Sequence, residues 1–345
     1  MKVSVCVHPF YTLKKSVQNL ENQPKAMIKS FFKLLFITAL SLLLNQVSVN
    51  AQPEAQGEPQ KLIDQPNSVL MNPVWSPDGE KIAFTSARYQ GLWIADENGN
   101  NINKITDQEA GYGFSWSTDS QSLLTRISEY ENRRRKLAVK IFNTDGSEYM
   151  VTDFRDEMPA LPTWADFDQQ VVLINEGKIE AFDSQKEVPE AMKQQSVKPF
   201  YVLKTNQIAK GIVPDNSTEN ISPFDEATYL NLEVSPDGRK LAFEVYGGNL
   251  YVMNIDGSGL VDLGKATRPS WAPDSEYVVA MVSEDDGYNI TKADLYALSV
   301  DGNERINLTS TTDLKAMNPD WSPAGDQILF DDADDGSIYV LNIEY

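Results

Sequence analysis

Short apolar segments alternate with turn-forming residues along most of the chain. In the clearest stretch, apolar runs at 73–75, 82–84 and 92–94 are followed by a fourth extended segment at 103–106. The first two runs are joined by Ser-Pro-Asp-Gly at 76–79, which has the composition of a type I turn, with serine first, proline second and glycine last. Four short strands with turn residues between them predict one antiparallel sheet of the kind that forms a propeller blade.

The same unit returns along the chain in six copies of varying fidelity. The position directly before the turn, called the anchor position here, carries a large side chain in most copies: Trp75, Trp116, Trp164, Val234, Trp271 and Trp321. Internal repetition with a period of about 40 residues is typical of propellers. The sequence therefore predicts an all-β, six-bladed β-propeller, in which the anchor tryptophans fill the wedges between neighbouring blades.

The two ends of the repeat region predict how the ring closes. The last repeat reaches Tyr345 after its third strand, and a segment at 60–64 matches the fourth strand of the first repeat. We therefore expect an N-terminal strand to complete the last blade, because this pairing removes exposed sheet edges. One insertion, at about 185–227, interrupts the repeats; we expect an outer strand at 201–205 and otherwise a long loop there.

The first 51 residues have the pattern of a secretory signal peptide. Residues 27–33 are basic, residues 34–44 form an apolar core, and small residues precede Gln52. An apolar core of this length is too short for a transmembrane span. We expect translation to start at Met27 and cleavage to follow Ala51. The product would be exported, periplasmic or secreted, and would consist of one propeller domain at 52–345.

Cleavage would also remove Cys6 and His8, the only cysteine and the only histidine of the chain. A chain without these residues has no Ser-His-Asp or Cys-His machinery, no His- or Cys-ligated zinc and no disulfide. The remaining 24 basic and 49 acidic residues give a net charge of −25, against −20 for the full chain. Such a surface disfavours nucleic acid and favours cationic partners or calcium, although acidity can also serve solubility alone.

The recurring Pro-x-Trp-Ser-Pro-Asp-Gly, Ile-Ala-Phe and Asp-Gly…Leu-Thr rhythm, over about 59–345, resembles the WD-like repeats of the TolB propeller family. The resemblance implies a periplasmic propeller of the Tol–Pal envelope system that binds a peptidoglycan-associated lipoprotein at its channel mouth. TolB proteins carry an α/β domain before the propeller, for which 52–58 leaves no room. The same repeats occur in prolyl-oligopeptidase-like and tricorn proteases, whose catalytic domains have no counterpart here, so they supply a fold and not an activity.

Blade topology predicts which loops share a face. Loops between second and third strands lie on the same side as blade-to-blade connections, and these loops are long and variable here. Such loops on a rigid scaffold usually carry recognition. We therefore take as partner-binding candidates a basic run, Arg133, Arg134, Arg135 and Lys136, and acidic residues Asp285, Asp286, Asp332 and Asp334. The acidic run at 331–336 resembles a calcium loop only loosely, so calcium stays a weaker alternative.

A second set of candidates shares one repeat position near the start of the innermost strands: Asn72, Asn231, Arg268 and Asn318. We expect these residues to surround the channel mouth, either as an ordinary polar rim or as ligand-binding residues.

The sequence thus predicts a monomeric, non-enzymatic scaffold that binds a protein partner, such as a peptidoglycan-associated envelope protein, or another envelope ligand, without a cofactor. The alternative is a hydrolase of the glycosidase or lactonase type that works with carboxylates alone or with calcium, but no carboxylate pair stands out in the sequence.

Overall fold

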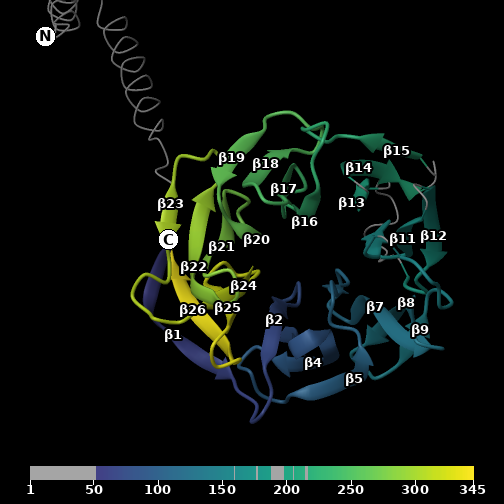
Figure 1. Ribbon diagram of the computed structural model, residues 1–345, viewed down its shortest axis with the longest axis horizontal. Coiled ribbons are helices and arrows are strands. Elements are labelled where there is room, and N and C mark those ends of the chain that lie inside the picture. The colour runs from purple at the N-terminus through teal and green to yellow at the C-terminus, as the bar shows by residue number, and fades with distance from the viewer. Residues whose placement is uncertain (1–51, 159, 176–177, 188–197, 205, 214–216) are drawn as a thin grey trace, which may run out of the picture. The chain divides into compact units, whose positions relative to one another are not determined.

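The computed structural model describes residues 52–345 except 159, 176–177, 188–197, 205 and 214–216 (Figure 1). The chain divides into two units, Met1–Gln52 and Pro53–Tyr345, and every described strand belongs to the second unit. The predicted signal peptide lies outside the described residues. In the part of the chain that the structure describes, no helix has the length and apolar character needed to cross a membrane.

Alternation of apolar and polar residues produces antiparallel strands that pair mainly with their sequence neighbours. We call each set of consecutive antiparallel strands a group. The first group consists of β2 (Leu70–Trp75), β3 (Lys81–Ser86), β4 (Gln90–Asp96) and β5 (Asn103–Glu109). The second consists of β6 (Ser115–Trp116), β7 (Ser122–Glu131), β8 (Arg134–Asn143) and β9 (Glu148–Met150), and the third of β10 (Thr163–Ala165), β11 (Gln170–Asn175) and β12 (Lys178–Asp183). The fourth group consists of β13 (Phe200–Lys204), β14 (Gln207–Ile212) and β15 (Ser217–Asn220), and the fifth of β16 (Tyr229–Val234), β17 (Lys240–Val245), β18 (Leu250–Asn254) and β19 (Val261–Gly264). The sixth consists of β20 (Thr267–Trp271), β21 (Tyr277–Asp285), β22 (Ile290–Ser299) and β23 (Arg305–Asn307). The seventh combines β24 (Ala316–Trp321), β25 (Gln327–Asp332) and β26 (Ile338–Glu344) with the N-terminal strand β1 (Glu54–Ile63). A short 3-10 turn, η1 (Ala87–Tyr89), links β3 to β4.

These groups follow one another around a ring (Figure 1). Their first strands contact the first strands of neighbouring groups, as in the pairs β2 with β24, β24 with β20, β20 with β16 and β16 with β13. The groups β2–β5 and β6–β9 are joined into one sheet by a single pair, Glu109 with Ser128. The all-β propeller architecture that the sequence predicted is therefore present, and the four strands expected in the first repeat lie within β2 to β5.

The described strands form seven groups, one more than the six predicted. The extra group is β13–β15, which lies in the segment predicted to be an insertion. Its β13 is not an outer strand as expected, since it contacts the first strands β10 and β16 of the neighbouring groups. The reason is visible in its burial: Phe200 and Val202 pack into the core shared with β10–β12, while Tyr201 packs into the core shared with β16–β18.

The N-terminal segment pairs with the last strand of the chain. β1 runs antiparallel to β26, with Lys61 opposite Tyr339 and Ile63 opposite Ile338. Most of the predicted segment 60–64 lies within β1, which also extends further toward the N-terminus than expected. The amine of Lys61 lies 2.7 Å from a carboxylate oxygen of Asp335, and this ion pair ties β1 to the turn that precedes β26.

The apolar core lies between neighbouring groups. One cluster combines Trp75 and Phe84 of the β2–β5 group with Leu329 and Val340 of β25 and β26. Four anchor tryptophans are buried as predicted: Trp75, Trp116, Trp271 and Trp321. Trp164 is half-buried. Val234, which holds the anchor position of its repeat in place of a tryptophan, is 41% exposed.

The two faces of the ring differ in their loops. On the turn face, which carries the Ser-Pro-Asp-Gly turns, Gly79 N–H donates to the Ser76 carbonyl at 2.8 Å, and Gly79 takes the left-handed φ of 74° that favours glycine. On the opposite face, which we call the hairpin face, turns between second and third strands meet the connections between groups; an example is the 3.0 Å hydrogen bond from Gly111 N–H to the Tyr89 carbonyl. The long hairpins β7–β8 and β21–β22 belong to the hairpin face.

Candidate functional site

The four channel-mouth candidates share an unusual backbone conformation. The φ angles of Asn72, Asn231, Arg268 and Asn318 are 52°, 47°, 57° and 48°, and each residue lies at a bulge in the first strand of its group. Left-handed φ is uncommon outside glycine, although asparagine tolerates it better than other residues do. Its recurrence at one repeat position shows that this kink belongs to the architecture of the inner strands.

The kinks direct polar groups toward two buried carboxylates. Asn72 N–H and the Asn318 side-chain amide donate to the same oxygen of Asp331, at 2.9 and 3.0 Å. In a second copy of the arrangement, Arg268 N–H and the Asn231 side-chain amide both donate to Glu244, each at 2.5 Å. The candidates are therefore brought together in pairs, and each pair links two neighbouring groups of strands.

The sequence analysis missed these two carboxylates. Asp331 and Glu244 each follow a fully buried phenylalanine in the second strand, Phe330 and Phe243, at a position where an acid is unexpected. An acidic residue directly after a buried phenylalanine was the sequence feature that could have identified them. Burial raises the pKa of Asp331 to about 7, while its hydrogen bonds to asparagine and the nearby Arg268 charge act in the opposite direction.

A second acidic pair lies on the first strands. Asp320 accepts hydrogen bonds from Trp75 N–H at 2.7 Å and from the Ser270 hydroxyl at 3.0 Å, so residues of β2, β20 and β24 meet at this carboxylate. Burial raises the pKa of Asp320 to about 7. Burial and then repulsion from Asp320 raise the pKa of Glu233, on β16, to about 7 as well. Glu233 is nevertheless an exposed residue by its accessible surface, so water in the ring reaches its carboxylate and weakens this effect, although the protein around it still disfavours the charged form.

Both residues of this pair directly precede the anchor position of their repeats. The sequence analysis passed over them because the residues at this position differ among repeats, and only the ring brings β16 and β24 close enough for Glu233 and Asp320 to interact. Carboxyls with pKa values raised in this way can each take up or release a proton near neutral pH.

The basic run occupies the tip of the β7–β8 hairpin. Asn132 and Arg133 form its two-residue turn with left-handed φ angles of 49° and 65°. Arg135 lies 3.2 Å from Glu109, and Lys136 lies 2.8 Å from Asp156. Arg133 and Arg134 are exposed. Half of the run is thus paired within the chain, and its first two arginines face solvent.

The acidic candidates serve the turns in which they lie. Asp285 accepts a hydrogen bond from Gly287 N–H at 2.9 Å, and Asp286 accepts two backbone N–H groups of the β21–β22 turn. Next to them, Tyr288 is 94% exposed at the hairpin tip.

The loop that resembled a calcium site is folded by its own carboxylates. Asp332 is buried and accepts hydrogen bonds from Lys315 N–H at 2.7 Å and Asp335 N–H at 2.9 Å, while Asp334 lies 2.8 Å from the Lys315 amine. Among the described residues, no cluster of three or more His, Cys, Asp or Glu side chains could hold a metal ion.

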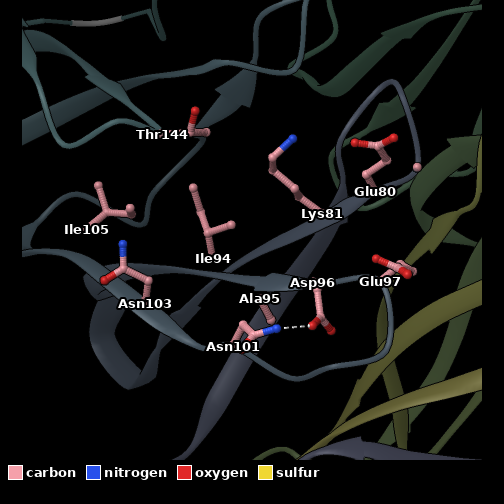
Figure 2. Close-up of a pocket in the computed structure, with 11 residues that line it drawn as sticks. Glu80, Lys81, Ile94, Ala95, Asp96, Glu97, Asn101, Asn103, Ile105 and Thr144 are labelled. Atoms are coloured by element: carbon pink, nitrogen blue, oxygen red, sulfur yellow. Dashed lines mark hydrogen bonds between the residues drawn. The ribbon is translucent and has the colours of Figure 1, made fainter.

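An open hollow lies on the turn face, beside the first Ser-Pro-Asp-Gly turn (Figure 2). Glu80, Lys81 and Glu97 line it, together with Asp96, whose carboxylate accepts a 2.7 Å hydrogen bond from the Asn101 amide. Its charged groups spread around the rim and do not converge on one point (Figure 2). The hollow therefore offers less chemistry than the carboxylates on the inner strands.

Comparisons with known proteins agree with this architecture. No family model matches the chain, and no curated protein matches it in sequence. Among solved structures, a protein of Agrobacterium tumefaciens provisionally assigned as a TolB superposes with a TM-score of 0.51 at 17% identity, over 82% of this chain and 92% of that one. An oligogalacturonate lyase of Vibrio parahaemolyticus superposes with a TM-score of 0.45 at 14% identity, over 84% of this chain and 96% of that one, which is too loose to bear on function. The likeness shows a shared fold, and the chain is an all-β protein with a TolB-like propeller fold.

Proposed function

We propose that this chain is an exported, non-enzymatic propeller that binds a protein partner or another cell-envelope ligand through its hairpin face. The observation that carries the proposal is the placement of the β7–β8 tip: a basic turn with two exposed arginines, Arg133 and Arg134, that form no ion pair with the residues described, in a chain of net charge −20. Rigid scaffolds that present long loops commonly use those loops for recognition. The TolB-like fold makes an envelope protein the first partner to test.

The test compares two sets of charge reversals in pull-downs from an envelope extract. Replacing Arg133, Arg134 and Arg135 by Glu should weaken partner capture and leave the melting temperature nearly unchanged, since this hairpin tip is exposed. The loss should shrink as salt rises, because exposed charges are screened.

Charge reversals at Glu80, Lys81, Arg239 and Lys240, beside the Ser-Pro-Asp-Gly turns, serve as the matched control. Capture that survives the arginine reversals but is abolished by the control set would show that the proposed face is the wrong one. If neither the wild-type protein nor the control variant captures a partner, the scaffold proposal itself is contradicted.

The enzyme alternative has one specific observation in its favour. Glu233 and Asp320 interact on the first strands with pKa values near 7, which suits general acid–base chemistry. Assays of the purified protein on glycosides and lactones would test it. Hydrolysis that disappears in both Glu233→Gln and Asp320→Asn, with partner capture unchanged, would favour the enzyme over the scaffold.

A further inference from the structure

Arg126 on β7 is a partly buried cation without an anionic partner among the described residues. One of its terminal nitrogens donates to the Met158 carbonyl at 3.1 Å, and its guanidinium lies 5.1 Å from the centre of the Tyr112 ring. No described carboxylate forms an ion pair with it; Tyr112 favours its charge electrostatically, whereas another cation, Arg135, opposes it. Burial and this like charge both lower the pKa of Arg126, so its surroundings disfavour its charge.

Arg126 differs in this respect from two other shielded basic side chains, which are paired: Lys140 lies 2.6 Å from Glu148, and Lys186 lies 2.8 Å from Asp119. Leaving a partly buried charge unpaired is costly, whereas a strongly acidic chain offers many potential partners. Because no residue that the structure describes supplies an anion to Arg126, we infer that another molecule can supply it.

The position of Arg126 in the repeat supports this reading. The residue ten places after the anchor position is Glu244 in one group and Asp331 in another, and both carboxylates are satisfied by hydrogen bonds near the channel mouth. In the β6–β9 group the same place holds a cation. Arg126 thus places a positive charge at a repeat position where Glu244 and Asp331 place a negative one, and where the other anchored repeats have the uncharged Thr85, Ile174 and Met281.

Aromatic groups lie beside the guanidinium on the hairpin face. Tyr89 of η1 and Tyr112 of the β5–β6 connection meet edge to face, with ring centres 5.0 Å apart. Tyr112 is 42% exposed, so a ligand from solvent can reach the neighbourhood of Arg126 past this ring. Tyrosine rings flank ligand groups with little loss of side-chain entropy, and their hydroxyls can donate hydrogen bonds.

We propose that Arg126, with Tyr89 and Tyr112, binds a carboxylate of a protein partner, either an acidic side chain or a C-terminal carboxylate. The planar guanidinium matches a carboxylate through two parallel hydrogen bonds, and one unpaired positive charge matches one negative charge. A doubly charged phosphate would meet more repulsion from the acidic chain. The inference rests on the proposed function and identifies the group that the hairpin face would recognise.

The test uses a labelled peptide with three consecutive glutamates, its glutamine counterpart and inorganic phosphate as competitor, with fluorescence anisotropy at fixed ionic strength. The glutamate peptide should bind and the glutamine peptide should not. Arg126→Gln should weaken binding at least about tenfold, and Arg126→Lys should weaken it as well, because lysine keeps the charge but lacks the fork.

Stability separates a binding role from a structural one. Arg126→Gln should be at least as stable as the wild type, because it removes an unpaired charge. The matched control is Arg155→Gln, since Arg155 also stacks on an aromatic ring, Phe182, but forms an ion pair with Glu180. This control should lose stability and bind the peptide normally. If Arg126→Gln loses as much stability as the control, or binds normally, the proposal is wrong, and effective competition by phosphate would refute carboxylate selectivity.

The outcomes also separate this inference from the proposed function. If an envelope partner is captured through the hairpin face but Arg126→Gln captures it equally well, only the carboxylate anchor fails. If the peptide binds through Arg126 while no protein partner is captured, the proposed function fails and the anion site stands.

Discussion

The Glu233→Gln variant should be more stable than the wild type above neutral pH and equally stable under acidic conditions. The backbone carbonyl of Glu233 accepts the Trp271 indole N–H, but its carboxylate accepts no hydrogen bond from the described residues, and its charge is opposed by the surrounding protein and by Asp320. Glutamine has nearly the same shape, so the substitution removes the charge with little change in packing.

The raised pKa of Glu233 explains why the variant is the more stable protein at high pH. The folded-state pKa of Glu233 is raised to about 7, so ionising this group costs free energy in the folded state but not in the unfolded chain. Wild-type stability should therefore fall as pH rises from the unfolded value, about 4.3, through the folded value. A shift of this size corresponds to roughly 3 kcal/mol for a fully buried group, and because water reaches Glu233 we expect about 1 kcal/mol.

The assay is urea unfolding of both proteins at intervals between pH 4.5 and 8.5, with the difference in unfolding free energy plotted against pH. The difference should grow from about zero to about 1 kcal/mol in favour of Glu233→Gln, and reach its plateau above pH 7. Glu80→Gln removes the same charge at an exposed turn and should show no such trend. A pH-independent difference, or a variant that is less stable at pH 8, would refute the reasoning about the inner-strand carboxylates.

Three further comparisons between variants test the packing and the buried hydrogen bonds. Ile63→Ala should cost about 2–4 kcal/mol in urea unfolding, because Ile63 joins β1 to the core, whereas Val69→Ala at a half-exposed site should cost under about 1 kcal/mol; equal losses would argue against a stabilising role for β1. Trp75→Phe should lower the free energy of unfolding by about 1 kcal/mol less than Trp321→Phe does. The indole N–H of Trp75 is buried and has no hydrogen-bond partner among the described residues, whereas that of Trp321 donates to the Gly325 carbonyl at 3.0 Å. Calorimetry of the two variants can compare these losses. Asp331→Ala should lose about 2–4 kcal/mol of unfolding free energy, because it leaves Asn72 N–H and the Asn318 side-chain amide without their acceptor, and Asp331→Asn should recover at least half of that loss. An alanine variant of wild-type stability would contradict the idea that Asp331 stabilises the contact between β2 and β24.

The repeat pattern predicted the all-β fold and many of the buried residues, because strand formation and burial both depend on local sequence. The turn at 76–79 and the alternation on either side of it specify strands, and a tryptophan before the turn is large enough to become buried in most groups. Where the repeat degenerated, prediction failed: the residues around Phe200–Lys204 carry no recognisable turn, so their sheet was expected to be an insertion.

The sequence also identified Asn72, Asn231, Arg268 and Asn318 as equivalent, which depends only on spacing. It could not identify the carboxylates that these residues contact, because hydrogen bonds such as that from Asn72 to Asp331 join residues 259 positions apart in the chain. The raised pKa values near the inner strands have the same origin, since Glu233 and Asp320 are ordinary acids until the ring brings β16 and β24 together and limits their hydration. The sequence by itself determined the strands and the surfaces that would be buried; the tertiary structure alone decided which charges face one another, because proximity between distant repeats arises only when the sheets pack into a ring.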